Sequence, residues 1–210
     1  MIVVGVLIAL AADRWMQGIL EARDEELYLN RIAADLELTI DEIAQTLPRI
    51  EQGLEAAQAL SRADASSLPA DSIVTLYITA SRTGVGRSQI GTDVAFRELV
   101  SSGRLNLLAD VEVRTAISEF YLDWEGLVRT FENREPLAVS ISELTGYMPY
   151  RLRGERGDLS AETKARIVAT TVERSESRSD FRRYHAQLDH QVNRLRGTLR
   201  DAEALLEILE

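Results

Sequence analysis

Two histidines and an aspartate near the end of the chain are residue types that could hold a metal ion. His185 and Asp189 are four residues apart and share one face of a helix, whereas His190 points elsewhere. Carboxylate-bridged di-iron bundles use Glu-x-x-His pairs, but Arg182 and Gln187 occupy the required glutamate positions here. The pattern therefore indicates a solvated helix face with local ion pairing, and we expect no metal site.

A glycine-rich stretch at residues 83–91 could cradle a phosphate group. It contains Gly84, Gly86 and Gly91. Phosphate-binding loops follow a strand, open a helix and often carry a lysine, but no strand is predicted before this stretch and it contains no lysine. We interpret it as a connection between helices and expect no cofactor.

Acidic residues are concentrated on the first predicted helix, where paired carboxylates could perform acid–base catalysis. A charge-rich outer helix face is the simpler interpretation. No cluster of serine, histidine and acid is indicated by sequence proximity, and the lack of cysteine excludes disulfides, thiolate metal sites and cysteine nucleophiles. We therefore expect a protein that is not an enzyme, without catalytic residues. The acidic residues are Glu21, Asp24, Glu25, Glu26, Asp35, Glu37, Asp41, Glu42, Glu51 and Glu55.

The composition indicates an all-α protein that does not bind nucleic acid. The chain has 210 residues and a net charge of -10, so it lacks the basic surface that displaces counterions from phosphate. The abundant leucine, alanine, glutamate and arginine are strong helix formers, and 45% hydrophobic residues suffice for a core.

Two helical seams should organise the fold, because apolar residues recur with alternating gaps of four and three. One helix is expected from the N-terminal apolar run to about Arg62, with a kink or local break at Pro48. The other runs from about Asp180 to the C-terminus. The seams comprise Leu29, Ala33, Leu36, Ile40, Ile43, Leu47, Ile50, Leu54 and Ala57 in the first helix, and Leu188, Val192, Leu195, Leu199, Ala202, Leu206 and Leu209 in the last.

We expect these two helices to pack antiparallel in an elongated bundle, with Ala57 near Phe181 and Leu29 near Leu209. A parallel pairing would place acidic residues of the two helices against each other. The antiparallel register brings Arg182 and Arg183 to Glu51 and Glu55, Arg194 and Arg196 to Asp41 and Glu42, Arg200 to Glu37, and Glu207 to Arg31.

Shorter helices between the seams should cover the remaining apolar side. The sequence predicts helices over residues 71–82, from a Thr92 cap to Gly103, from an Asp110 cap towards Pro136, and over residues 160–172. Gly103 is expected to form a left-handed helix end. In the Asp110-capped helix the buried side should comprise Val113, Ile117, Phe120, Tyr121, Trp124, Leu127, Val128 and Phe131.

The run from Ile2 to Ala12 is entirely apolar or glycine, and Trp15 follows it. At 1.5 Å per residue the run covers roughly 17 Å, less than the hydrocarbon core of a bilayer. It suits the C-terminal part of a transmembrane helix, the apolar region of a signal peptide, or a buried helix of the bundle. We expect the first, with Trp15 at the interface, which makes residues 1–18 a membrane anchor and residues 19–210 a helical bundle.

Several spaced motifs resemble a family of uncharacterised bacterial proteins known only as a domain of unknown function. The resemblance implies one N-terminal membrane helix and an all-helical domain outside the inner membrane, but no reaction, ligand or catalytic residue. Family members usually have amides at Asp13 and Arg14. The motifs are Ile8-Ala9-Leu10, Trp15, Tyr28-Leu29-x-Arg31-Ile32-x-x-Asp35-Leu36, Phe96-x-x-Leu99-x-Ser101-Ser102-Gly103-x-Leu105-x-Leu107-Leu108-x-Asp110, Arg114 and Phe120-Tyr121.

These features favour a single-pass inner-membrane protein whose helical domain lies in the periplasm and acts as a scaffold or interaction module. Its expected partners are the lipid bilayer, through Ile2 to Ala12 and Trp15, and a second protein or another copy of the chain. The alternative is a sensory or ligand-binding bundle that signals through its membrane helix, although a sensor needs something to read its second state.

Overall fold

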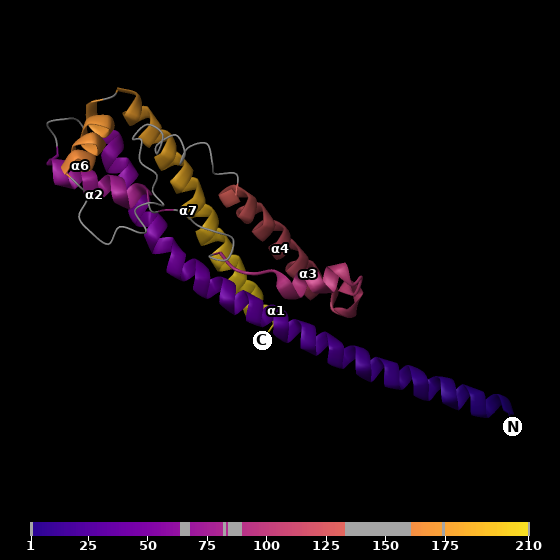
Figure 1. Cartoon of the computed structure of the whole chain (residues 1–210). Coiled ribbons are helices and arrows are strands. Elements are labelled where there is room, and N and C mark those ends of the chain that lie inside the picture. Colours follow the sequence, from indigo (N-terminus) through magenta and orange to yellow (C-terminus); the bar gives the residue numbers. More distant parts are fainter. Residues whose placement is uncertain are drawn as a thin grey trace.

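The computed structural model describes residues 2–63, 68–81, 83, 90–132, 161–173 and 175–209, and all regular structure within them is helical (Figure 1). This confirms the all-α prediction. The predicted segments after Pro136 and up to Leu159 lie outside the described residues. The elements are α1 (Ile2–Arg62), α2 (Ala70–Ser81), α3 (Val94–Ser101), the 3₁₀ turn η2 (Leu105–Leu107), α4 (Val111–Glu132), α6 (Ala161–Val168), the π-helical turn η4 (Ala169–Glu173) and α7 (Ser175–Leu209).

Helix α1 forms the long axis of the molecule, and it is continuous for 61 residues. Pro48 lies inside it without the local break that the sequence allows. Proline removes one backbone hydrogen bond, in this case to the carbonyl of Ala44. Both Pro48 and Ala44 are exposed, so water can bond the released carbonyl and the helix continues.

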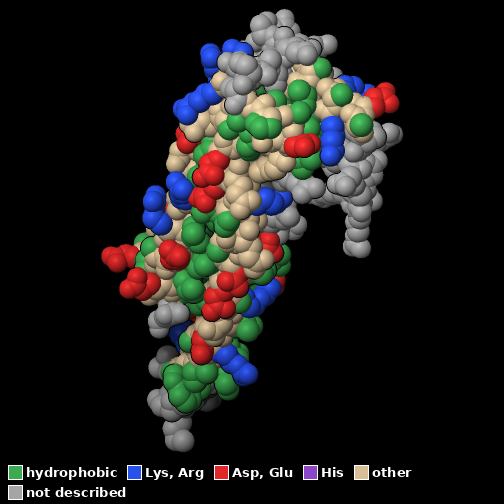
Figure 2. Space-filling view, turned by 90° about the vertical axis from the view of Figure 1, so that its left-hand side faces the viewer, with side chains coloured by type: hydrophobic (Ala, Val, Ile, Leu, Met, Phe, Trp, Pro, Cys, Tyr) green, Lys and Arg blue, Asp and Glu red, His purple; other side chains and the backbone are tan. Residues whose placement is uncertain are grey.

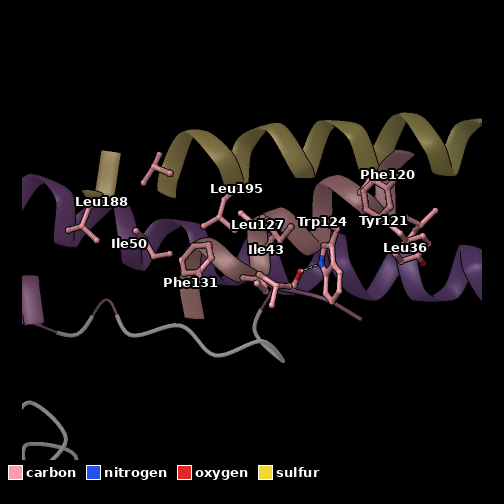
Figure 3. Packing of buried hydrophobic residues seen from close by; sticks show 14 of the residues in the cluster. Leu36, Ile43, Ile50, Phe120, Tyr121, Trp124, Leu127, Phe131, Leu188 and Leu195 are labelled. Carbon is pink, nitrogen blue, oxygen red and sulfur yellow. Dashed lines mark hydrogen bonds between the residues drawn. The ribbon is translucent and has the colours of Figure 1, made fainter. Parts of the chain in front are cut away.

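Helices α1 and α7 pack against each other and run in opposite directions (Figure 1). Figure 3 shows Leu188 and Leu195 of α7 directed towards α1, where Ile50 and Ile43 lie on the facing side. All four side chains are fully buried. The expected antiparallel pairing of the two terminal helices is therefore present.

The buried face of α1 is broader than the predicted seam. Leu36, Ile43, Ile50 and Ala57 are buried as expected, but the alternate seam positions are only partly covered. Helices α2, α3 and α7 all contact α1, so it is enclosed from more than one side rather than along one coiled-coil stripe. The additional buried positions are Tyr28, Ile32, Thr39, Thr46, Gly53, Ala56, Leu60 and Ser61.

The ion pairs between the terminal helices differ from the predicted ones. Arg196 pairs with Glu51, with 2.6 Å between Nη2 and Oε1, instead of with Asp41 or Glu42. Arg31 is bonded to Glu98 of α3 rather than to Glu207. Arg183 pairs with Asp180 of its own helix, and Arg194 donates to the backbone oxygen of Asp123 in α4 at 3.1 Å. The prediction considered only α1 and α7, whereas α3 and α4 compete for the same arginines.

Helix α4 packs on α7 and supplies four buried aromatic side chains of the core, which are Phe120, Tyr121, Trp124 and Phe131 (Figure 3). Asp110 caps it as predicted, because its Oδ1 accepts hydrogen bonds from the backbone N–H groups of Glu112 and Val113 at 2.8 and 3.1 Å. Its predicted buried face is confirmed, apart from Val113, which is only partly buried.

The start of α7 corrects the predicted break at residues 173–179. The helix begins at Ser175 rather than near Asp180. Ser177 is buried, and its hydroxyl donates to the backbone oxygen of Thr170 at 2.7 Å. A serine-rich stretch resembles a loop in sequence, but here one serine bonds the turn of η4 and residues 175–179 belong to α7.

The first part of α1 projects beyond the bundle (Figure 1). Every residue from Leu10 to Arg23 is exposed, and the helix crosses the expected boundary between residues 18 and 19 without interruption. No helix in the part of the chain that the structure describes is both long and apolar enough to cross a membrane. The transmembrane helix expected from the sequence is therefore not found among these residues. We call residues 2–27 the stem.

Candidate functional site

A tight corner between α3 and η2 docks on α1 where the stem enters the bundle. Gly103 has the predicted left-handed conformation, with φ of 70°. The N–H of Arg104 donates to the carbonyl of Leu99, and that of Gly103 to the carbonyl of Val100, both at 3.0 Å. This is the Schellman arrangement of a helix end. Beyond it the chain turns and buries Leu108 completely.

A polar cluster joins this corner to α1. Arg31 Nη2 lies 2.5 Å from Glu98 Oε2, and the Tyr28 hydroxyl donates to Glu98 Oε1 at 3.2 Å. The hydrogen bond from Arg31 lowers the pKa of Glu98, and the same bond raises the pKa of Arg31. Both side chains of the pair are partly exposed.

Arg104 completes the cluster from the other side of the corner. It forms an ion pair with Asp24, and its guanidinium carbon lies 5.6 Å from the centre of the Tyr28 ring. The guanidinium carbon of Arg31 lies 5.4 Å from the same ring, so two cations interact with one aromatic side chain. Glu25 adds a bond by accepting the backbone N–H of Ala109 at 2.7 Å. We call these side chains the stem-base cluster.

The next turn of α1 holds the beginning of α3. The sequence predicts Thr92 as the cap, but the cap position is Asp93, whose side chain makes no capping bond. Instead Asp35 Oδ2 accepts the N–H of Ala95 at 2.8 Å. Thr39 accepts the N–H of Thr92 at 3.3 Å, so α1 caps a helix that lies some sixty residues further along the chain.

Aromatic side chains fill the space behind the corner. Phe96 and Tyr121 stack with ring centres 4.5 Å apart, and Trp124 Nε1 donates to the carbonyl of Ile90 at 2.9 Å (Figure 3). The Tyr121 hydroxyl is buried and has no hydrogen-bond partner among the described residues. Burial raises its pKa, and the charge of Asp35 adds to that rise.

The stem-base cluster is suited to holding elements together rather than to catalysis. Its charged groups are already paired with one another, and it contains no serine, cysteine or histidine nucleophile. A hollow of about 540 Å³ lies beside it. The hollow is lined by Gly18, Glu21, Ala22, Glu25, Arg104, Asn106, Leu107 and Ala109.

The residues that the sequence marked as metal candidates do not assemble into a site. Asp189 and His190 are exposed, and Asp189 accepts a hydrogen bond from Asn193 at 3.3 Å. Within the described chain no group of His, Cys, Asp and Glu could hold a metal ion. Gly84 and Gly86 lie outside the described residues. Gly91 has φ of 111° and packs against Thr39, which explains the need for glycine in structural terms.

His185 instead lines a second hollow, which the sequence reasoning missed. This basic pocket has a volume of about 490 Å³ and lies between the end of α1 and the start of α7. The sequence contains a signal for this pocket. Arg178, Arg182 and His185 are separated by four and three residues, which places them on one face of a helix. The lining residues are Gln58, Ser61, Arg62, Arg178, Arg182 and His185.

No family model, no curated protein and no solved structure matches this chain. The stem, the stem-base cluster and the basic pocket are the features of this chain that bear on its function. The resemblance to the bacterial family remains an expectation from the sequence.

Proposed function

We propose that this protein is a non-enzymatic, membrane-attached scaffold that uses its stem to hold a helical bundle near a bilayer. The observation that carries the proposal is the exposed apolar stem. Six large hydrophobic side chains of the stem are between 49% and 73% exposed, whereas Tyr28, at its base, is only 6% exposed. These side chains are Leu10, Trp15, Met16, Ile19, Leu20 and Leu27.

A bilayer suits the start of the stem because the run from Ile2 to Ala12 is apolar or glycine at every position, so no side of this segment of helix is polar. Figure 2 shows hydrophobic side chains gathered at the lower tip of the molecule, where the first described part of α1 lies. In the proposal the run from Ile2 to Ala12 enters the hydrocarbon, and Trp15 lies at the interface beside Asp13 and Arg14. The resemblance adds the expectation that the bundle lies in the periplasm.

The stem-base cluster supports a scaffold role. It fixes the first packed turn of α1 to the α3–η2 corner through Arg31, Glu98 and Arg104. A bundle held this way presents its outer faces at a defined direction from the membrane. A protein partner or a second copy of the chain would bind those faces.

Vesicle flotation tests the attachment. The full-length chain should float with phosphatidylcholine vesicles, and Leu10→Asp combined with Trp15→Ser should reduce flotation at least fivefold. Leu122→Ser is the matched control, because Leu122 is a large hydrophobic residue on α4 that is 74% exposed and lies away from the stem. Equal flotation of the stem variant and the wild type would contradict the proposal.

Two further measurements test the side of the membrane and the role. In spheroplasts of a bacterial host, protease added outside should degrade the bundle, and protection until lysis would contradict a periplasmic location. A pull-down from detergent extract should recover a stoichiometric partner or a homo-oligomer.

The alternative, a ligand-binding sensory bundle, is favoured by the basic pocket and would be revealed by a small molecule that raises the melting temperature.

A further inference from the structure

The basic pocket lies at the end of the bundle remote from the stem. Arg62 is in the last turn of α1, and Arg178 is in the first turns of α7 (Figure 1). The two helices run in opposite directions, so the end of one meets the start of the other at this point. The hollow is therefore formed by residues that are more than a hundred positions apart in sequence.

Positive charge in the pocket is uncompensated among the described residues. Arg62, Arg178 and Arg182 take part in none of the ion pairs there. The carboxylate of Asp180 lies in the same turn of α7 but is occupied by Arg183. Three guanidinium groups around one hollow repel each other, in a chain whose net charge is -10. A bound anion would remove this repulsion.

We propose that the basic pocket binds the phosphate group of a ligand that carries at least two negative charges. Guanidinium groups present forks of N–H donors that match phosphate oxygens, and arginine is the usual residue for such recognition. His185, on the same face of α7 as Arg178 and Arg182, supplies a further ring N–H.

The α1 side of the pocket contributes polar groups of another kind. Ser61 lines the hollow, and its hydroxyl donates to the carbonyl of Gln58 at 2.7 Å, which leaves the hydroxyl oxygen available as an acceptor. The Gln58 side chain can donate or accept. These two groups suit hydroxyl or amide groups attached to the phosphate. The volume of about 490 Å³ lies within the range of small-molecule sites and exceeds what a lone phosphate needs.

The same phosphate chemistry has two sources, a soluble phosphate compound and the headgroup of an anionic lipid. Titration calorimetry with sodium pyrophosphate, at constant ionic strength and with the full-length chain, tests the first source. The second is tested by comparing binding to phosphatidylcholine vesicles with and without phosphatidic acid. The stem is expected to contribute to binding of both vesicle types, so only the part of the difference that the pocket variants remove reports the pocket.

Arginine-to-glutamine variants decide whether the pocket is responsible. Arg178→Gln and Arg182→Gln should each weaken binding about tenfold or more, because each removes a charge-assisted hydrogen bond. Arg200→Gln is the matched control, since it makes the same change of charge at an exposed position of α7 outside the pocket. It should alter binding less than twofold. Circular dichroism and melting curves identify any variant that fails to fold.

Each outcome of these experiments either supports or contradicts the proposal. Pocket-dependent binding of pyrophosphate supports the proposal with a soluble ligand, and pocket-dependent binding of phosphatidic acid vesicles alone supports it with a lipid headgroup. Absence of both, or an equal loss in Arg200→Gln and the pocket variants, would overturn it. The pyrophosphate titration does not depend on whether the stem binds a membrane.

Discussion

Arg31 of α1 and Glu98 of α3 form an ion pair across 67 positions of sequence, with 2.5 Å between Nη2 and Oε2. The pair lies at the point where the exposed stem becomes a packed helix. Tyr28, one turn before Arg31, bonds the other oxygen of the same carboxylate. One glutamate therefore ties two successive turns of α1 to α3.

Glu98→Gln should loosen the corner without unfolding the bundle. Hydrogen exchange at the η2 amides should accelerate in the variant at pH 7, while the amides of α7 keep their protection. The lowered pKa of Glu98 gives the pair a stabilising effect that is complete above the ordinary value of 4.5 and is lost as the pH falls through the lower folded value.

The exchange difference between wild type and Glu98→Gln should therefore shrink in acid, below pH 4.5. Glu125→Gln is the control, because Glu125 pairs with Arg129 within α4, away from the corner. A corner that exchanges equally fast in wild type and Glu98→Gln at pH 7 would show that the ion pair does not hold it.

Trp124→Phe should reduce the free energy of unfolding by about 2 to 4 kcal/mol. The change removes the donor to the carbonyl of Ile90, which is itself fully buried, and it leaves part of the indole volume empty. Urea unfolding measures the loss. Leu122→Ala, at an exposed position of the same helix, should change stability by less than about 0.5 kcal/mol. A loss below about 1 kcal/mol in Trp124→Phe would contradict the packing shown in Figure 3.

The sequence predicts those features that depend on neighbours in the chain. The Asp110 cap, the left-handed Gly103 and the apolar face of α4 are local patterns of known physical origin, and all three are confirmed. The end of α1 at about Arg62 was also predicted, although Pro48 lies inside the helix. Each of these predictions needs knowledge of no more than a few turns of chain.

The candidate sites depend on contacts that no local pattern contains. Asp35 caps α3 from another helix, and nothing near Val94 in sequence indicates this. The basic pocket forms only after α1 and α7 meet, although the spacing of its α7 residues was visible. The predicted ion pairs were wrong for the same reason, since the helices that compete for Arg31 and Arg194 were not considered.

Tyr121→Phe should leave the stability at pH 7 unchanged or raise it by up to about 1 kcal/mol. The hydroxyl is buried without a partner among the described residues, so its removal eliminates an uncompensated desolvation. A loss above about 2 kcal/mol would show that the hydroxyl has a partner in solution.

The raised pKa of Tyr121 also predicts how the stability of wild type and Tyr121→Phe changes with pH. Because the folded pKa of Tyr121 is raised, the unfolded state releases its proton first, and stability falls as the pH rises above the ordinary value of 10.0. Tyr121→Phe should lose less stability than wild type between pH 9 and pH 11. Identical slopes in urea unfolding over that interval would contradict the assignment.

Replacing each of three glycines by alanine should change the free energy of unfolding by a different amount. Gly91→Ala forces a side chain into a left-handed backbone and into the volume of Thr39, and should cost roughly 3 kcal/mol. Gly103→Ala meets no neighbour within 4 Å and bears only the backbone strain, about 1 to 2 kcal/mol. Gly197→Ala lies in an open helical position of α7 and should gain up to about 1 kcal/mol. Thermal unfolding of the three variants gives the order, and a neutral Gly91→Ala would contradict the close approach to Thr39.

The alignment of α7 on α1 can be tested through Arg196. The structure pairs it with Glu51, whereas the register predicted from the seams places it near Asp41 and Glu42. A double-mutant cycle of Arg196→Gln with Glu51→Gln should give a coupling of about 0.2 to 1 kcal/mol, because both side chains are partly exposed and screened by water. The matched cycle with Glu42→Gln should give no coupling beyond experimental error. Coupling to Glu42 without coupling to Glu51 would contradict the ion pair that the structure shows.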